Sequence, residues 1–318
     1  MNKLTKIGLT ALAGSLIAGS VNAADMAVTG SASITFGGGD NNSNTGNGWS
    51  MTDGVTFSAS GDVNDIGVTL SLELDGGAQE SDTAGSSQLM DDRSITFDLG
   101  DRGTLVFAGH GGSSAMSARD DILPTAKEEP WDVVTGADAD IINGHSGENM
   151  FTYTYDHDSG FKFVGAYLNA SDAQSDTSYS DFGIEYSGIE GLRLVYAAGD
   201  VESVTNTKTE ENTIAGTYAM GAITLGVQVS ESDSNAANGD TESTGVGISY
   251  QVNEDLAVSY GAHTIEYATG SDQESTAVGF SYTMGSMSIS GTMNSVDNIA
   301  NAAANDREAY EFGVSFSF

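Results

Sequence analysis

The chain has 318 residues and carries 45 acidic against 10 basic side chains, which gives a formal net charge of −35 at pH 7. Because a nucleic-acid-binding protein needs a cationic surface, this charge excludes that class. The absence of cysteine excludes disulfides and lipid attachment through a cysteine. Aromatic and branched residues recur evenly along the chain, which excludes a disordered acidic chain.

The first 23 residues have the three parts of a secretory signal peptide. Lys3 and Lys6 form a basic start, residues 7–18 are apolar and uncharged, and a cleavage site with small residues ends at Ala23. The apolar part is shorter than the roughly 20 residues that a membrane helix needs. We therefore expect residues 1–23 to be removed and residues 24–318 to be exported.

From residue 28 to the C-terminus, apolar and polar residues alternate in one segment after another. Strict alternation places the apolar residues of a strand on one face. Sixteen such segments are predicted, at residues 28–36, 55–59, 66–74, 95–99, 105–107, 151–155, 161–167, 182–186, 192–196, 214–218, 223–229, 246–250, 256–260, 278–282, 287–293 and 310–318. Bacterial outer-membrane barrels have an even number of antiparallel strands, and sixteen satisfies that rule.

Short and long connections alternate between these segments. The short ones contain Gly, Asn or Asp, which tolerate the positive φ of tight turns. The long ones are polar and cover residues 37–50, 75–92, 110–149, 170–178, 200–210, 231–242, 267–273 and 294–306. Tight turns at one end and longer loops at the other are typical of a membrane barrel. We predict an all-β fold: a sixteen-stranded antiparallel transmembrane β-barrel with both termini in the periplasm.

Alternation alone also fits a soluble β-sandwich, in which the polar face would lie outside. Three observations favour the barrel: the signal peptide, the even number of strands and the C-terminal strand, residues 310–318, which ends in an aromatic residue, Phe318. A secreted or surface-exposed acidic adhesin without channel activity remains the alternative.

The longest interruption, residues 110–149, is the candidate functional segment because long connections without secondary structure are usually functional. It contains both prolines of the chain, Pro124 and Pro130, and one of its two tryptophans, Trp131. Proline restricts φ and lowers the entropy that a loop loses on ordering, which indicates a packed loop. Most of its charged residues are carboxylates.

With these features the chain resembles a general bacterial porin of the alphaproteobacterial type. The resemblance covers residues 24–318 and implies a trimeric, water-filled barrel in the outer membrane of a Gram-negative bacterium. It also implies that the third long loop, residues 110–149, folds inward and narrows the pore. By the same resemblance, Phe318 is the signal that the outer-membrane assembly machinery reads.

The resemblance assigns a set of charged residues to the pore. The predicted constriction contains Arg119, Asp120, Asp121, Lys127, Glu128, Glu129, Asp132, Asp138 and Asp140. The predicted lumen wall, assigned by strand parity, contains Glu73, Asp98, Lys162, Glu185 and Arg193. The family commonly faces loop carboxylates with arginines, whereas few basic residues have the right parity here. We therefore expect a net acidic constriction that concentrates cations, with passive diffusion of small hydrophilic solutes.

Other patterns predict no chemistry. The four histidines lack the spacing of metal ligands, and no nucleophile, phosphate-binding or dinucleotide-binding motif occurs. We expect no enzymatic activity and no cofactor, and only weak Ca²⁺ binding at acidic loops is left open. The expected partners are two further copies of the chain, outer-membrane lipid, the assembly machinery, and small solutes and cations.

Overall fold

The computed structural model describes residues 25–40, 48–75, 79–80, 92–138, 141–142, 144, 146–147, 149–169, 177–203 and 208–318. The predicted signal peptide, residues 1–23, and the predicted constriction residue Asp140 lie outside the described residues. In the described part of the chain, no helix is long and apolar enough to cross a membrane.

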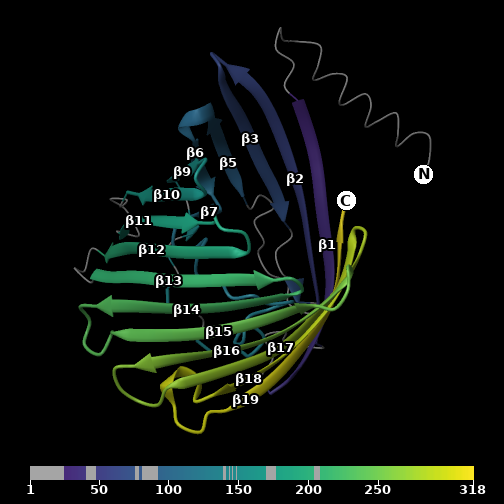
Figure 1. Cartoon of the computed structure of the whole chain (residues 1–318), viewed down its shortest axis with the longest axis vertical. Helices are drawn as coiled ribbons and strands as arrows, with labels where there is room; N and C mark the ends of the chain where they lie inside the picture. Colours follow the sequence, from purple (N-terminus) through teal and green to yellow (C-terminus); the bar gives the residue numbers. More distant parts are fainter. Residues whose placement is uncertain are drawn as a thin grey trace.

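Sixteen long antiparallel strands form one closed sheet (Figure 1). β1 pairs with β2 on one side and with the last strand, β19, on the other, so the barrel has no free edge. The strands are β1 (Asp25–Gly39), β2 (Trp49–Val63), β3 (Ile66–Asp75), β5 (Arg93–Asp98), β6 (Thr104–His110), β9 (Met150–His157), β10 (Phe161–Leu168), β11 (Thr177–Tyr186), β12 (Leu192–Ser203), β13 (Lys208–Met220), β14 (Ile223–Ser234), β15 (Thr241–Gln251), β16 (Leu256–Tyr267), β17 (Gln273–Met284), β18 (Met287–Asp297) and β19 (Arg307–Ser317). The predicted fold class is confirmed.

Three short strands and two turns of 3-10 helix complete the structure. β4 (Gln79–Glu80) pairs with β2, and β7 (Gly112–Ser113) pairs with β8 (Ser146–Gly147) to form a separate two-stranded sheet. The helical turns are η1 (Gly100–Arg102) and η2 (Ile299–Asn301).

The two faces of the sheet differ as the alternation predicts. On the apolar face, large side chains are exposed, such as Ile214 at 60%, Val278 at 59% and Met293 at 66%. On the opposite, polar face, the intervening residues are small or polar, and Gln228 and Ser230 are buried between exposed Val227 and Val229. A face of exposed apolar side chains is expected of a barrel whose outside meets lipid.

Aromatic side chains gather near the short turns, where membrane barrels carry an aromatic girdle. Phe161 and Tyr186 lie on paired strands with ring centroids 4.7 Å apart. The tyrosine hydroxyl of Tyr153 donates a hydrogen bond to the backbone carbonyl of Arg102 in the neighbouring turn. Tyr218 and Tyr282 lie two residues before the ends of β13 and β17, and Tyr250 lies one residue before the end of β15.

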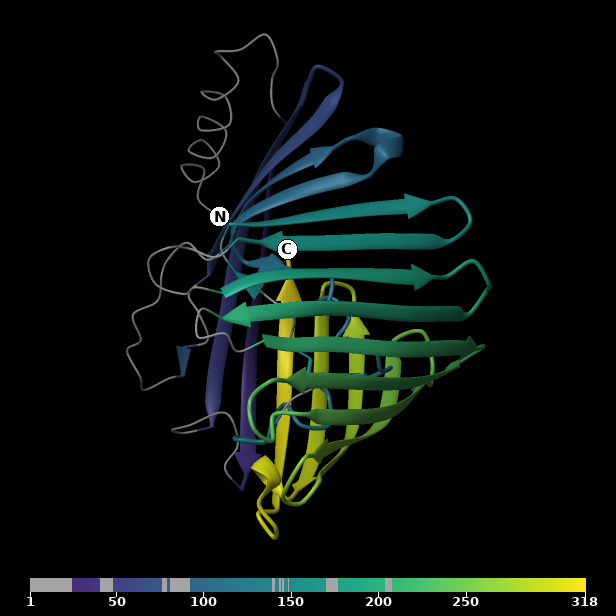
Figure 2. The ribbon, with the colours of Figure 1, turned by 90° about the vertical axis from the view of Figure 1, so that its left-hand side faces the viewer.

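Several strands extend further toward the long connections than the alternation predicts. β2 begins at Trp49 rather than near residue 55, and β13 begins at Lys208 rather than near residue 214. The start of β13, KTEENT, is polar and has no apolar periodicity, and that of β2 has only Trp49 and Met51 before Asp53 and Gly54, yet both backbones continue the ladder with β12 and β1. Hydrogen bonding of the backbone, which is independent of side-chain polarity, sets the strand ends. Figure 2 shows the long strands of the barrel in a view turned by 90° from that of Figure 1.

Candidate functional site

The segment between β6 and β9, residues 111–149 and here called the long loop, contacts the polar face of the sheet from β11 to β19. The first of these contacts is made by Asp181 on β11, whose carboxylate accepts hydrogen bonds from the backbone N–H groups of Ala115 (3.1 Å) and Met116 (2.6 Å). The hydroxyl of Tyr179 donates to the same carboxylate at 2.8 Å. Buried Asp181 therefore fixes the first turn of the loop.

Side chains of the next strands hold the middle of the long loop by its backbone. Gln228 on β14 accepts from the N–H of Ile122 (3.2 Å) and donates to the carbonyl of Asp120 (2.7 Å). The hydroxyl of Ser259 on β16 accepts from the N–H of Ala126 at 2.8 Å. In each of these bonds the wall residue is a polar side chain, and the residues before and after it along the strand point to the apolar face. These wall residues therefore all lie on the polar side of the sheet.

The last part of the long loop is held in the same way by β17 and β18. Asn294 on β18 donates to the carbonyl of Glu129 at 2.6 Å. Gln273 on β17 accepts from the N–H of Asp138 (2.9 Å) and donates to its carbonyl (2.8 Å). A small apolar cluster adjoins these bonds and consists of Val133, Val134, Val296, Ile299 and Ala309. The long loop is therefore packed and not extended into solvent, as its prolines predict.

Glycines on the polar face provide the space that the loop occupies. A Cβ at Gly226 would lie 2.4 Å from Pro124 Cδ, and one at Gly247 would lie 2.9 Å from the same atom. Similar close contacts join Gly245 to Leu123, Gly261 to Pro130 and Gly183 to Arg119. We call Gly183, Gly226, Gly245, Gly247 and Gly261 the glycine track. Any larger side chain at these positions would push against the loop.

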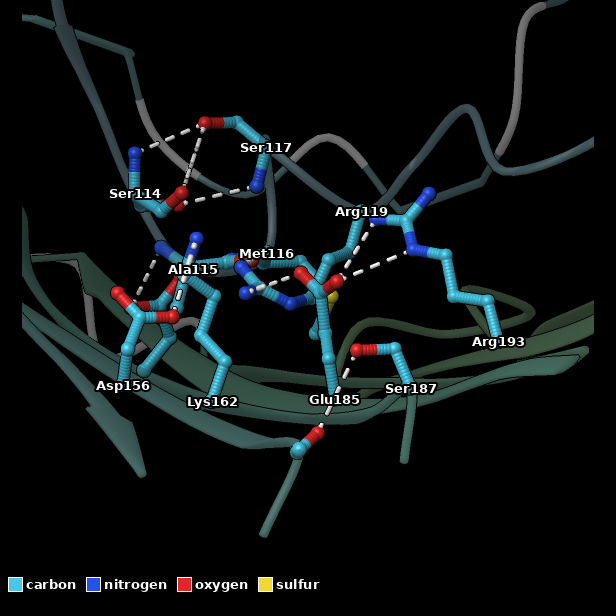
Figure 3. A network of polar contacts seen from close by, with 12 residues as sticks. Ser114, Ala115, Met116, Ser117, Arg119, Asp156, Lys162, Glu185, Ser187 and Arg193 are labelled. Atoms are coloured by element: carbon cyan, nitrogen blue, oxygen red, sulfur yellow. Dashed lines mark hydrogen bonds and ion pairs between the residues drawn. The ribbon is translucent and has the colours of Figure 1, made fainter. Parts of the chain in front are cut away.

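Arg119 is a buried residue of the long loop and forms an ion pair with the wall (Figure 3). Its Nη2 lies 2.6 Å from Glu185 Oε1 on β11, and the Nη2 of Arg193 on β12 lies 3.0 Å from Glu185 Oε2. Burial lowers the pKa of Arg119, and the charge of Glu185 opposes this effect. Two guanidinium groups thus share one carboxylate, which holds the loop against β11 and β12.

Lys127 pairs with acids on both the loop and the wall. Its Nζ contacts the carboxylate of Glu128 and lies 3.5 Å from Glu311 Oε1 on β19. Arg307, also on β19, donates a hydrogen bond to the carbonyl of Thr135. The two basic residues predicted for the constriction, Arg119 and Lys127, therefore both contact carboxylates on the barrel wall.

The acids of the long loop gather around Glu129. Carboxylate oxygens of Glu128, Glu129 and Asp132 all lie within 4.8 Å of one another. Loss of solvation raises the pKa of Glu129 to about 8, and the hydrogen bond with Asp132 and the charges of Asp121 and Asp132 act in the same direction. Partial desolvation, followed by the charge of Asp132, also raises the pKa of Asp121.

The two remaining described acids of the predicted constriction lie beside the wall. Asp120 is half-buried, and its backbone carbonyl contacts Gln228. Asp138 is exposed and accepts a hydrogen bond of 2.5 Å from the hydroxyl of Tyr267 on β16. The structure therefore places Asp121, Glu128, Glu129 and Asp132 in one group and Asp138 at a separate place.

The predicted lumen-wall residues all lie on the polar face, at different heights. Lys162 lies 3.6 Å from Asp156, and Glu185 binds Arg119 and Arg193. Asp98 lies next to a short turn and accepts a hydrogen bond from the N–H of Gly100 at 2.9 Å. Glu73 on β3 lies opposite Thr56 on β2.

Among the first seven long strands of the barrel, β1, β2, β3, β5, β6, β9 and β10, hydroxyl groups are common on the polar face of all but β6 and β10, where residues such as Val106, Val164 and Ala166 take their place. Ser33 and Thr52 are hydrogen-bonded across β1 and β2 at 2.5 Å, and Ser58 lies opposite Ser71 on β3. Thr69 continues this row to Thr96 on β5. Among the described residues of these strands, Lys162 is the single basic side chain on the polar face, because Arg93 has the parity of the apolar face.

Sequence reasoning missed the wall residues that hold the loop, namely Asp181, Gln228, His263, Gln273, Asn294, Arg307 and Glu311. The available signal was their size and polarity in strands whose polar faces otherwise carry many Ser, Thr, Ala and Gly residues. Nothing in the sequence shows which loop residue each one contacts.

The decisive comparison follows from this architecture. A family model described as Gram-negative porin matches residues 8–272. The chain is a Gram-negative porin. It therefore belongs to a family of non-enzymatic channels for diffusion across the Gram-negative outer membrane. This assignment sets aside the alternative of an adhesin without channel activity. No curated protein sequence matches the chain.

Solved porin structures share the fold at low sequence identity. An anion-selective porin from Comamonas acidovorans matches with a TM-score of 0.67 and 15% identity, over 93% of this chain and 100% of the other. The trimer form of OmpT from Vibrio cholerae matches at 0.70 and 15% identity, over 93% and 99%. A mutant of the Rh. blastica porin matches at 0.65 and 14% identity, over 92% and 100%. At such identities the likeness is one of fold.

Proposed function

We propose that this porin is a cation-selective diffusion channel whose long loop folds into the barrel and narrows it. The observation that carries the proposal is the set of loop contacts with the polar face from β11 to β19, which leave the acids around Glu129 beside the passage. Carboxylates that line a narrow passage lie within the screening distance of about 8 Å at physiological ionic strength, so they attract cations and repel anions.

The distribution of basic residues supports the same sign of selectivity. The two arginines that meet at the long loop share Glu185, and Lys127 contacts two carboxylates. The polar face of β1, β2 and β3 consists largely of hydroxyl groups with acids such as Glu73, and in the described residues of these strands it carries no basic side chain. A positive wall opposite the loop acids is therefore missing from the described strands β1–β3, and the field across the passage is weak.

Reversal potentials across a KCl gradient in planar bilayers test the selectivity. We expect a cation preference that falls when Glu128 and Asp132 are replaced together by Gln and Asn. The exposed acid Glu210, paired with Lys208 near a long connection, provides a matched control, and its replacement by Gln should leave the potential unchanged. An anion preference of the unmodified channel would refute the proposal.

We infer further that the porin is a homotrimer that uses the strands near β1 and β2 for its contacts. Support comes from Asp53, an exposed carboxylate that lies opposite Ala32 on the apolar face, next to exposed Met51. A carboxylate facing lipid is costly, so coverage by a second copy removes this cost. The trimer form of the Vibrio cholerae OmpT structure supports this proposal. Because each chain then offers one thiol, a trifunctional thiol cross-linker should trap trimers from cysteines placed at Met51, whereas it should not do so from cysteines at Ile214.

The role of Phe318 in assembly and the alphaproteobacterial subtype both remain proposals. Phe318 exchanges backbone hydrogen bonds with Gly30 on β1 (2.7 and 2.9 Å), and its ring lies over that glycine. Deletion of Phe318 should lower the amount of folded protein in the outer membrane without changing the conductance of the channels that form. Normal surface levels after the deletion would contradict this proposal.

A further inference from the structure

A small cavity lies between the acidic part of the long loop and β14–β16. Asp121, Glu129 and Trp131 line it from the loop, and Gln228 and His263 line it from the barrel wall. The space accessible within it is about 10 Å³, which suits a single water molecule or a metal ion. The cavity is therefore a place where loop and wall enclose one small ligand.

His263 on β16 is the unexplained group of this cavity. Its side chain is 4% exposed, and neither Nδ1 nor Nε2 has a hydrogen-bond partner among the described residues. Trp131 packs against the imidazole with ring centroids 4.3 Å apart. A buried polar group without a partner costs free energy, so such a group indicates a bound water, an ion or a functional role.

The opposite side of the cavity carries crowded carboxylates. Glu129 belongs both to the cavity lining and to the group of carboxylates with Glu128 and Asp132. Asp121 lines the same cavity, so carboxyl groups crowd there, and half-buried Glu129 has lost part of its hydration. A bound cation would relieve both effects, because it compensates charge and replaces lost hydration.

We propose that this cavity binds one divalent cation of the borderline class, such as Zn²⁺ or Ni²⁺, between His263 of the wall and Glu129 of the long loop. An imidazole together with carboxylates suits these ions, whereas Ca²⁺ and Mg²⁺ prefer oxygen ligands alone. The neighbouring carboxylates, Asp121 and Asp132, supply further negative charge. The site joins two elements that are far apart in the sequence, which explains why histidine spacing did not reveal it.

Two consequences follow from an ion at this place. It links the long loop to β16, so it opposes movement of the loop away from the wall. It also adds two positive charges beside the acids of the passage, so it lowers the cation preference. The second consequence rests on the proposed function, whereas binding itself does not.

Calorimetric titration of the folded porin in detergent with Zn²⁺, in excess Mg²⁺ to occupy weak acidic sites, tests the binding. We expect one Zn²⁺ per chain. Removal of a ligand in His263→Gln or Glu129→Gln should weaken binding at least about tenfold. The matched control is His157→Gln, since His157 is exposed in a short turn and bonded to Ser159. This variant should bind as the unmodified protein does.

Equal Zn²⁺ affinity in the His263→Gln variant, or no binding by the unmodified porin, would overturn the proposal. The Glu129→Gln variant keeps the test valid if His263→Gln fails to fold, because Glu129 lies in the loop and outside the strands. Reversal potentials with and without Zn²⁺ then test the effect on selectivity separately. If Zn²⁺ binds and the selectivity does not change, the result contradicts the proposed position of the acids beside the passage. It does not contradict the cation site itself.

Discussion

The two arcs of this barrel differ in what their polar faces do. The N-terminal arc, β1 to β10, presents rows of serine and threonine, such as Ser58 opposite Ser71. The C-terminal arc, β11 to β19, presents glycines, buried amides and carboxylates that bind the long loop. The polar face of the N-terminal arc is therefore rich in hydroxyl groups with scattered charges such as Glu73 and Lys162, whereas that of the C-terminal arc is covered by the charged long loop. The asymmetry shows that one docked loop can give the two arcs of a barrel different roles, because the C-terminal arc supports the loop and the N-terminal arc does not.

The largest effect is expected when a residue of the glycine track is replaced by one with a large side chain. Gly247→Leu places a side chain where even a Cβ would lie 2.9 Å from Pro124 Cδ, so the loop must leave its place on the wall. We expect single-channel conductance to rise, by roughly twofold, and cation preference to fall as the acids move away from the passage. Gly61→Leu on β2 is the control, because a Cβ there meets no atom within 4 Å. An unchanged conductance in Gly247→Leu would show that the loop does not narrow the channel.

Arg119 tests whether the ion pair with the C-terminal arc holds the loop. Arg119→Gln leaves the half-enclosed Glu185 with Arg193 as its remaining basic partner. Breaking a buried ion pair from one side costs on the order of 3 kcal/mol, so the folded porin should lose heat resistance and show more frequent conductance fluctuations. Lys208→Gln, which removes the exposed pair with Glu210, is the comparison and should change neither property.

Those outcomes would be contradicted by a melting temperature of Arg119→Gln equal to that of the unmodified porin. In that case the hydrogen bonds of Asp181 and Gln228 alone would account for the position of the loop.

The smallest expected effect is on pH dependence. Glu129 has a pKa raised from 4.5 to about 8, so it is neutral in the folded channel at neutral pH and ionises as the pH rises through about 8. Cation preference should therefore increase between about pH 7 and pH 9. The folded state binds more protons than the unfolded one between 4.5 and about 8, so this group's contribution to stability falls across that range and stays lost above it.

Reversal potentials measured across this pH range check the prediction. Glu129→Gln should give a curve that is flat around pH 8, while Glu210→Gln on the exposed strand end should retain the rise. A rise of equal size in both variants would assign the titration to other groups.

The fold was predictable because its main determinant is local. Alternation in segments such as residues 223–229 requires only neighbouring residues to be read, and it correctly placed Val227 and Val229 on one face and Gln228 on the other. That the long loop is packed was predicted from its prolines, whereas its inward fold was implied only by the family resemblance. Strand ends such as Lys208 were missed because polar strand ends and polar loops have the same composition.

The candidate site was less predictable because it depends on contacts between distant segments. Arg119 reads as a pore-facing cation in the sequence, yet its guanidinium is buried against Glu185, 66 residues further along the chain. His263 reads as an isolated histidine until the fold brings Glu129 and Trp131 to it. Gly226 and Gly247 read as weak points of strands, and only the docked Pro124 explains them.

The two contacts that β19 makes with the long loop bear on the order in which the protein is built. Lys127 and Thr135 are bonded to Glu311 and Arg307, and both partners lie within the final dozen residues of the chain. β19 must pair with β1 before these partners are fixed in space. Closure of the β1–β19 seam and full attachment of the long loop are therefore coupled. A barrel whose seam is still open would also hold its long loop loosely.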